Sequence, residues 1–266
     1  MGMRATSLIS RAGMMLADLI LPRTCAACGA SIDLSDKDLC ETCARQLAAG
    51  AGGSYCRTCG EDRGEHLLHD GRCTRCVLGK SLRRFHGFAR VGKYDGVLKS
   101  LILRFKTSFV LDRLLGDLLA SAILGMMDVR AVDCWVPIPS HWTRRVSTLY
   151  QPTDLLARAA VRAWGGRVEP VLKMSGIVRP FHMQPGLSAK ERAEQIRGKM
   201  QMRRAADVQG LHICLIDDVM TTGATIGEAS RVLRDAGAAA ISVAVLARAG
   251  GNEPVHPGVD PAGKAA

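Results

Sequence analysis

Apolar residues in the middle and last parts of the chain follow two alternating patterns. Short runs rich in Val, Ile and Leu predict buried strands near 85–91, 132–137, 168–172, 211–217 and 240–247. Between these runs, apolar residues that recur every three or four positions predict helices near 95–105, 111–127, 153–164 and 225–236. Strands that alternate with helices form parallel sheets, so we predict an α/β fold.

The chain ends and one internal stretch fall outside this alternation. The stretch 175–204 is polar and basic and shows no clear strand. Residues 1–22 carry an apolar streak that Arg11 and Asp18 interrupt, which favours a short amphipathic helix over a secretory signal. No apolar run reaches the length of a membrane span and nothing points outside the cytosol, so we expect a cytoplasmic protein. The tail 250–266 is rich in Pro and Gly, and we expect it to be disordered.

Cysteines dominate residues 23–80. Eight of the ten cysteines form four C-x-x-C pairs, separated by eleven, twelve and thirteen residues: Cys25/Cys28, Cys40/Cys43, Cys56/Cys59 and Cys73/Cys76. Two such pairs supply the four thiolates of a tetrahedral zinc site, so this segment is predicted to be a double zinc ribbon. Sequential pairing is the simplest arrangement, and a cross-braced one, in which the first and third pairs share an ion, stays open. Cys134 and Cys214 lie alone in apolar runs and are expected in the core.

The expected role of the two Zn2+ ions is structural. Four cysteines complete the metal's coordination and leave no open position for a substrate, and the nearby His66 and His69 are not needed as ligands. Redox-active dithiols are the main alternative, although a redox motif normally occurs once, on a βα unit. The repeated letters CAACG and CRTCG, which end at Gly29 and Gly60, support two copies of one unit. The metal would then fold a segment too small and polar to fold alone.

Charge is unevenly distributed along the chain. The 266 residues carry a net charge of +11, with 47% hydrophobic and only 4% aromatic residues. Residues 81–113 hold eight Lys/Arg against two Asp/Glu and residues 130–204 hold fourteen against five, whereas residues 205–266 hold four against seven. The basic excess is either an ordinary solvated surface or the footprint of an anionic partner, such as a phosphorylated substrate or nucleic acid.

The stretch ICLIDDVMTTGATIGEA, residues 213–229, joins a predicted buried strand to two adjacent acids. Asp217 and Asp218 fall beyond the carboxyl end of the strand, where open α/β sheets bind ligands. Two carboxylates repel a phosphate, but they accept hydrogen bonds from vicinal hydroxyls or join a Mg2+ shell. The alternative is an ordinary strand–turn–helix, in which the acids only cap the helix or face solvent.

Small residues follow the acids and predict an anion site. The turn and helix start are expected at Thr221, Thr222, Gly223, Ala224 and Thr225. Thr225 and Glu228 match a capping box that opens the next helix. Backbone N–H groups at a helix start bind anions, and small residues let the anion touch the backbone. A phosphate cradle beside a carboxylate pair indicates a ribose 5-phosphate.

The letters LIDDVMTTGAT resemble the phosphoribosyltransferase fingerprint, and this resemblance covers roughly residues 85–248. It implies a type I phosphoribosyltransferase-like parallel sheet that binds phosphoribosyl pyrophosphate, with the acids on the ribose hydroxyls and the loop on the 5-phosphate. The residues that match are Asp217, Asp218, Thr221, Thr222, Gly223, Ala224 and Thr225. The resemblance also implies Mg2+ bound through the substrate's pyrophosphate, beside a loop for which VPIPSHWTRR, with Pro137, Pro139, Arg144 and Arg145, is the candidate.

With the cysteine pairs, YDGVLKSLILRFK and VPIP added, nearly the whole chain resembles the ComF family of competence-associated proteins. Lys106 matches that family's lysine after the helix at 95–105, and a further basic stretch resembles the family at Gln184, Leu187, Arg192 and Arg197. The chain departs from the family at LYQP, residues 149–152, where relatives tend to show an Arg-x-Asn-Gln-like run, and at Phe181, where a threonine is common. The expected domains are the helix at 1–22, the double zinc ribbon at 23–80, the phosphoribosyltransferase-like domain at 81–249 and the tail at 250–266.

Two functions follow from this resemblance. In the first, the protein binds phosphoribosyl pyrophosphate and handles single-stranded DNA during uptake, with DNA-uptake proteins such as a helicase as partners. Few aromatics are available to stack bases; those nearest to basic residues are Phe85, Phe88, Tyr94, Trp142 and Tyr150. In the second, the protein transfers the phosphoribosyl group to an unknown nucleobase or amine, with Lys106, Arg144 and Arg145 as candidate pyrophosphate partners. No residue stands out as a general base for an acceptor.

Overall fold

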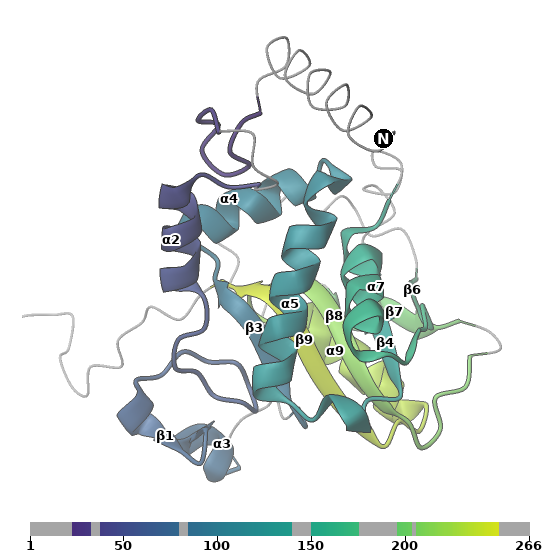
Figure 1. The fold of residues 1–266 in the computed structure, drawn as a ribbon. Helices are drawn as coiled ribbons and strands as arrows, with labels where there is room; N and C mark the ends of the chain where they lie inside the picture. Colours follow the sequence, from purple (N-terminus) through teal and green to yellow (C-terminus); the bar gives the residue numbers. More distant parts are fainter. Residues whose placement is uncertain are drawn as a thin grey trace, which may run out of the picture.

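The structure is a computed structural model that describes residues 23–32, 38–79, 85–139, 150–175, 196–203 and 206–249. Its centre is a five-stranded sheet in the order β3-β9-β8-β4-β5, in which all neighbouring strands are parallel (Figure 1). The strands are β3 (Phe88–Lys93), β4 (Cys134–Pro137), β5 (Arg167–Val168), β8 (His212–Met220) and β9 (Ala240–Arg248). The two longest strands, β8 and β9, lie in the middle of the sheet and are buried on both faces, which explains their nearly continuous apolar sequences.

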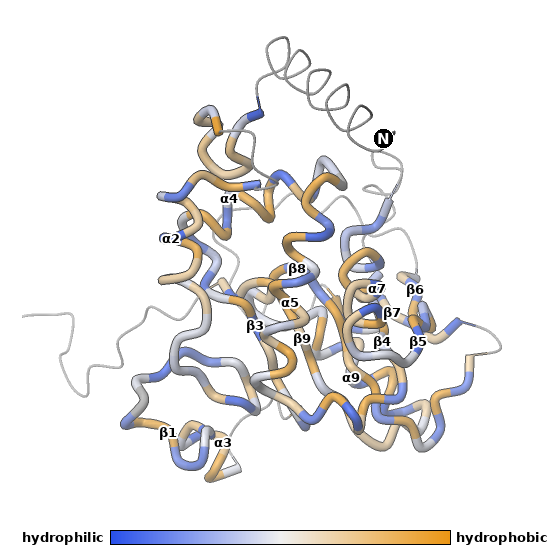
Figure 2. The backbone as a smooth tube through the Cα atoms, viewed as in Figure 1, coloured by the Kyte–Doolittle hydropathy of each residue, from blue (hydrophilic) through white to orange (hydrophobic). Residues whose placement is uncertain are grey.

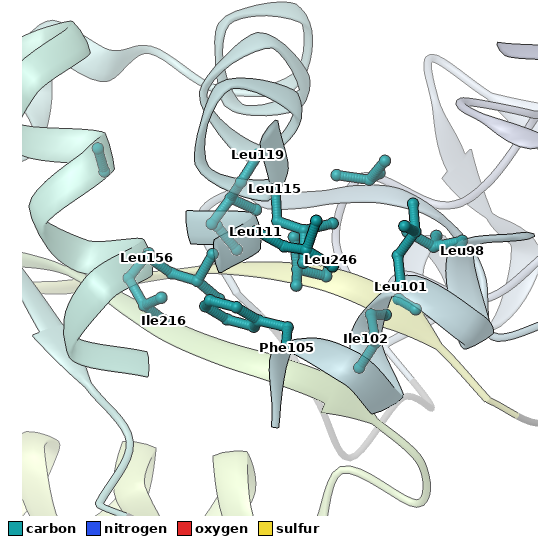
Figure 3. Packing of buried hydrophobic residues seen from close by; sticks show 14 of the residues in the cluster. Leu98, Leu101, Ile102, Phe105, Leu111, Leu115, Leu119, Leu156, Ile216 and Leu246 are labelled. Atoms are coloured by element: carbon teal, nitrogen blue, oxygen red, sulfur yellow. The ribbon is translucent and has the colours of Figure 1, made fainter. Parts of the chain in front are cut away.

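Three helices cover one face of the sheet. They are α4 (Gly96–Phe105), α5 (Asp112–Met126) and α7 (Pro152–Trp164), with short 3-10 turns at η2 (Phe109–Leu111) and η3 (Val129–Ala131). Their leucines pack with Phe105 against Ile216 of β8 and Leu246 of β9 (Figure 3). Helix α4 therefore rests directly on the two central strands.

The opposite face is covered by helix α9 and a small antiparallel pair. Helix α9 (Ala224–Asp235) packs on the sheet together with β6 (Leu172–Met174) and β7 (Met200–Met202). Because side chains alternate along a strand, Ile213 and Leu215 face this layer, whereas Cys214 and Ile216 face the helices α4, α5 and α7. Figure 2 shows apolar residues along the central strands and along the helices that pack on them.

The cysteine-rich part of the chain forms two small units that lie apart from each other (Figure 1). The first contains helix α2 (Glu41–Gly50), which packs against α4. The second contains η1 (Glu65–Leu67), the antiparallel strands β1 (Leu68–His69) and β2 (Arg72–Cys73), and helix α3 (Thr74–Val77). Each unit contacts a different part of the α/β core.

The predicted α/β fold with a parallel sheet is confirmed, with three differences in detail. The apolar run at 168–172 is divided between β5 and β6, and β8 continues three residues beyond the predicted end, to Met220. The stretch 175–204 contains the strand β7, which was not expected. Such a short strand has almost no periodicity to detect, and it exists because it pairs with β6 and because Met200 is buried in the core.

Two expected segments, the helix at 1–22 and the tail at 250–266, lie outside the described residues. Among the helices that the structure describes, none combines the length and the apolar character needed to cross a membrane.

Candidate functional site

The two acids lie at the carboxyl edge of the sheet because β8 is longer than its neighbour. Strand β4 ends at Pro137, which is in register with Ile216, and the N–H of Ile138 donates to the Ile216 carbonyl at 2.9 Å. Asp217 and Asp218 come next. They lie within β8, and not beyond its carboxyl end as predicted, because β8 continues beside β9 past the point where β4 ends. Both are partly buried, so they are held by the sheet and still reach solvent.

Each acid has a defined environment in the structure. The Asp217 carboxylate accepts the N–H of Asp218 at 2.9 Å, and the Asp218 carboxylate forms an ion pair with the Lys106 ammonium at 3.1 Å. The Asp218 side chain is 13% exposed and the Lys106 side chain is 22% exposed, so this ion pair is largely shielded from water. The predicted site residues Asp218 and Lys106, more than a hundred residues apart in sequence, are therefore brought together.

The end of α4 places Lys106 at this edge. Lys106 caps the helix, with its N–H donating to the Ile102 carbonyl at 3.1 Å. The hydroxyl of Tyr150 donates to the neighbouring Phe105 carbonyl at 2.6 Å, and this hydrogen bond ties the start of α7 to the end of α4. Burial raises the pKa of Tyr150 above its ordinary value, so this hydroxyl stays a donor at neutral pH.

A tight loop links the end of β8 to helix α9, as the sequence predicted. Gly223 precedes the helix with φ 70°, a left-handed conformation that glycine adopts without strain. The helix begins at Ala224, whose N–H lies 3.4 Å from the Thr222 hydroxyl. Thr221 is exposed and Thr222, Ala224 and Thr225 are partly buried, so the loop presents backbone N–H groups and hydroxyls at the start of a helix.

The predicted capping box is wrong. Gly223, which has no side chain to cap with, occupies the N-cap position, and Thr225 already lies inside the helix. Glu228 faces away from the helix start: its buried carboxylate accepts the N–H of Gly198 at 2.8 Å and two hydrogen bonds from Arg231. These hydrogen bonds, first of all those from Arg231, hold the pKa of Glu228 below its ordinary value. The sequence pattern matched the box, but a neighbouring segment competed for the carboxylate.

Several predicted site residues lie outside the described part of the chain. They are Arg144, Arg145, Gln184, Leu187, Arg192, Phe181 and the first residue of LYQP. Arg197 is described, close enough to Glu228 to contribute to lowering its pKa. Of the aromatics named as possible base-stacking residues, Phe85 and Phe88 are buried in the core at 6% and 0% exposure. They face Tyr55 and the sheet, so they cannot stack on a base.

The eight paired cysteines form two separate clusters in sequential order. Cys25, Cys28, Cys40 and Cys43 form one, and Cys56, Cys59, Cys73 and Cys76 form the other, with the sulfur atoms of each cluster within 4.8 Å of one another. The sulfurs of Cys28 and Cys40 are 3.8 Å apart, as are those of Cys59 and Cys73. A tetrahedron with zinc–sulfur bonds of about 2.3 Å has edges of about 3.8 Å, so both clusters fit a zinc ion.

The backbone N–H groups around the sulfur atoms and the pKa values of the cysteine thiols also fit zinc binding. The N–H of Cys43 points at the Cys40 sulfur at 3.5 Å and the N–H of Cys73 at the Cys56 sulfur at 3.3 Å, as expected around thiolates. The hydrogen bond from Cys59 lowers the pKa of Cys56 to about 4, whereas burial raises the pKa of Cys43 to about 12. Without a cation, neighbouring thiols cannot all ionise, and a divalent ion removes that conflict. Two four-cysteine clusters thus fit two structural zinc ions.

Residues outside the cysteine pairs attach the clusters to the core, and sequence reasoning missed them. Arg90 of β3 is fully buried, forms an ion pair with Asp62 of the second unit, and lies over the Tyr55 ring at 4.4 Å. Arg248 donates to the Cys59 carbonyl at 2.9 Å. Arg104 of α4 donates to the Ala26 carbonyl at 3.0 Å in the first unit. The charge of Arg90 in the middle of the apolar strand β3 was a signal that the sequence offered.

Two family models match the chain. The segment 16–77 matches the double zinc ribbon domain, and the segment 168–258 matches the phosphoribosyl transferase domain. The zinc ribbon and the phosphoribosyltransferase-like core expected from the sequence are therefore confirmed.

Curated relatives match over most of the chain. Competence protein F of Haemophilus influenzae is 28% identical over 234 residues, which are 85% of this chain and 96% of that protein. DNA utilization protein YhgH of Escherichia coli K12 is 27% identical over 243 residues, 86% of this chain and 99% of that protein. The resemblance to the ComF family is confirmed by these relatives.

Solved structures resemble only part of the chain. A glutamine phosphoribosylpyrophosphate amidotransferase from B. subtilis is 23% identical, with a TM-score of 0.34, over 50% of this chain and 25% of that one. That likeness is too weak to bear on the fold, which rests on the sheet and the family matches.

Proposed function

We propose, for a competence-related chain that joins a double zinc ribbon to a phosphoribosyltransferase-like domain, that the carboxyl edge of the sheet binds phosphoribosyl pyrophosphate. The observation that carries this proposal is the arrangement of residues 217–225. Two partly buried acids and a glycine-containing loop at a helix start adjoin each other on one strand end. A ligand with a phosphate next to a vicinal diol fits both halves at once.

The loop at the start of α9 and the two acids of β8 would bind different parts of the ligand, because their charges differ. The loop offers backbone N–H groups at the start of α9, where the helix dipole favours an anion, so it would take the 5-phosphate. Asp217 and Asp218 would repel that phosphate and accept hydrogen bonds from the ribose hydroxyls. Gly223 allows the phosphate to approach the backbone because no side chain stands in the way.

The pyrophosphate end of the ligand needs positive charge. Lys106 already lies 3.1 Å from Asp218, so its ammonium would be shared between the ribose acids and the pyrophosphate. Arg144 and Arg145 are proposed as further partners, and Mg2+ bound to the pyrophosphate would add charge neutralisation. Catalysis at such a site, if a group is transferred, comes from positioning and charge stabilisation of the leaving pyrophosphate.

Handling of single-stranded DNA during uptake is the second part of the proposal. It is supported by the similarity to competence protein F and to a DNA utilization protein, and by the basic segments at 81–113 and 130–204. Because Phe85 and Phe88 are buried, DNA contacts would rest on Lys and Arg at phosphates more than on stacking. A helicase or other DNA-uptake protein would be a partner in that process.

Calorimetric titration with phosphoribosyl pyrophosphate and Mg2+ tests the ligand. We expect binding by the natural chain and its loss in the double variant Asp217→Ala, Asp218→Ala. Asp235→Ala at the far end of helix α9 is the control, because this acid is 62% exposed and forms a local ion pair with Arg231. Unchanged affinity in the double variant would disprove the ribose role, and no binding by the natural chain would disprove the site.

An active phosphoribosyltransferase is the other candidate function, favoured by the match to the phosphoribosyl transferase domain. It predicts release of pyrophosphate when candidate nucleobases or amines are added to the bound ligand. Binding without turnover for any acceptor would favour the DNA-uptake function alone.

DNA binding is tested by titration of labelled single strands at increasing salt. Phosphate contacts release counterions, so we expect affinity to fall steeply with salt concentration. If the protein does not bind single-stranded DNA even at low salt, the DNA role is contradicted and the phosphoribosyltransferase function is the better supported one.

A further inference from the structure

One C-x-x-C turn of each zinc cluster accepts a hydrogen bond at a backbone carbonyl from an arginine of the α/β core. We call these two turns, Cys25–Cys28 and Cys56–Cys59, the zinc knuckles. At the first cluster, Arg104 of α4 donates to the carbonyls of Ala26, at 3.0 Å, and Cys25, at 3.4 Å. At the second cluster, Arg248 at the end of β9 donates to the carbonyl of Cys59 at 2.9 Å. In both cases the acceptor lies within the C-x-x-C turn itself, so the position of the turn and the position of the guanidinium depend on each other.

Both arginines also adjoin the proposed ligand site through the backbone. The Arg104 carbonyl accepts the N–H groups of Thr107 at 3.0 Å and Ser108 at 2.9 Å, together with the Thr107 hydroxyl at 3.0 Å. These three hydrogen bonds shape the turn that contains Lys106, the partner of Asp218. Arg104 therefore connects the first zinc knuckle to the residue that faces the acids.

Arg248 adjoins the other half of the site. It is in register with Met220, the last residue of β8, and the N–H of the following Ala249 donates to the Met220 carbonyl at 2.9 Å. Thr221, which opens the phosphate loop, comes directly after Met220. The Nε of Arg248 is buried without a hydrogen-bond partner among the described residues, and its Nη1 donates to the Cys59 carbonyl.

We propose that Arg104 and Arg248 are positioning residues through which the two zinc knuckles set the geometry of the ligand site. Through Arg104, the first knuckle would hold Lys106 in position, and thereby its partner Asp218. Through Arg248, the second knuckle would hold the end of β8 in position, directly before the phosphate loop. The packing of α4 makes this transmission stiff, because Phe105 lies in the same apolar cluster as Ile216, the residue before the acids (Figure 3). This inference rests on the proposed binding of phosphoribosyl pyrophosphate.

A double-mutant cycle between Arg104 and Lys106 separates positioning from a general structural role. Arg104→Met removes the hydrogen bonds to the knuckle and keeps the length of the side chain. We expect phosphoribosyl pyrophosphate, titrated with Mg2+, to bind about fivefold more weakly to this variant. In the Lys106→Met background the same change should cost about twofold or less, because its effect passes through Lys106.

Two further variants control the cycle. Arg45→Met on α2 makes the same change in the same zinc unit, at a side chain that is 72% exposed and forms a surface pair with Glu41, and we expect unchanged binding. Arg104→Lys keeps one donor, so its loss of affinity should be intermediate; it replaces Arg104→Met if that variant does not fold. Arg248→Met should also weaken binding, and its effect should persist in the Lys106→Met background because it acts through the loop.

Zinc release to a colorimetric chelator supplies a readout that does not depend on the ligand. We expect Arg104→Met to accelerate release of one of the two ions and Arg248→Met to accelerate release of the other. Equal affinity of Arg104→Met and the natural chain, or losses that simply multiply with Lys106→Met, would overturn the inference while leaving the proposed function intact. Absence of binding by the natural chain would overturn the proposed function and this extension with it.

Discussion

The two zinc units carry the same ligand pattern but are attached to the protein in different ways. In the first, Cys28 is exposed and Cys40 is partly exposed. Its contacts with the core include the hydrogen bonds of Arg104 and apolar packing, because Cys25, Cys43 and Leu47 lie in the main hydrophobic cluster. In the second, all four cysteines are buried. Its contacts include the buried ion pair of Asp62 with Arg90, which also lies over the Tyr55 ring.

The glycines that follow the second cysteine of each unit differ in the same direction. Gly29 has φ 77°, and no atom of the described residues lies within 4 Å of the place where its Cβ would be. Gly60 has φ 70°, and a Cβ built there would lie 2.2 Å from the Phe88 ring of β3. The repeated motif thus determines each metal site, whereas residues outside the motif determine how firmly each unit is joined to the sheet.

The largest effect is expected when the buried ion pair is broken. Asp62→Ala leaves the Arg90 guanidinium buried without its carboxylate, which destabilises a protein by about 3–5 kcal/mol. The matched change in the first unit, Glu41→Ala, removes a surface pair with Arg45 at 3.9 Å and should have little or no effect. Chemical denaturation of the zinc-loaded variants measures both. Similar losses in the two variants would show that the buried Asp62–Arg90 pair contributes no more than a surface pair.

A smaller effect is expected from the paired glycines. Gly60→Ala combines the left-handed backbone with overlap against Phe88, and we expect a loss of about 2–4 kcal/mol in the free energy of unfolding. Gly29→Ala should lower the free energy of unfolding by about 1–2 kcal/mol, because it adds the cost of the left-handed backbone without steric overlap. The same denaturation experiment on the two variants gives the difference, and a larger loss for Gly29→Ala would contradict the packing seen at Phe88.

The smallest effect concerns rates and not stability. The natural chain should hold about two zinc ions, one for each set of four cysteines. We expect a chelator to remove them in two phases, the first cluster before the second, because Cys28 is exposed and the second cluster is fully buried. Cys28→Ser should abolish the fast phase and Cys76→Ser the slow one. Release in a single phase would mean that exposure does not distinguish the two sites.

Local patterns in the sequence were enough to predict much of the fold and many residues of the candidate site. The periodicity of apolar residues is a property of a strand or helix by itself, so the parallel sheet and its helices were predicted close to their observed bounds. C-x-x-C pairs and the run DDVMTTGAT are equally local, because their chemistry needs neighbouring residues. The strand β7 and the role of Glu228 escaped prediction since each depends on a distant partner, β6 in one case and Gly198 in the other.

The sequence by itself therefore determined which residues could bind zinc and which could cradle a phosphate beside a pair of acids. Tertiary structure decided the sequential grouping of the cysteines, the pairing of Lys106 with Asp218, and the contacts of Arg90, Arg104 and Arg248 with the zinc units. The physical reason is that a metal knuckle or a phosphate loop is formed by adjacent residues, whereas an ion pair or an arginine–carbonyl contact joins segments that only folding brings together.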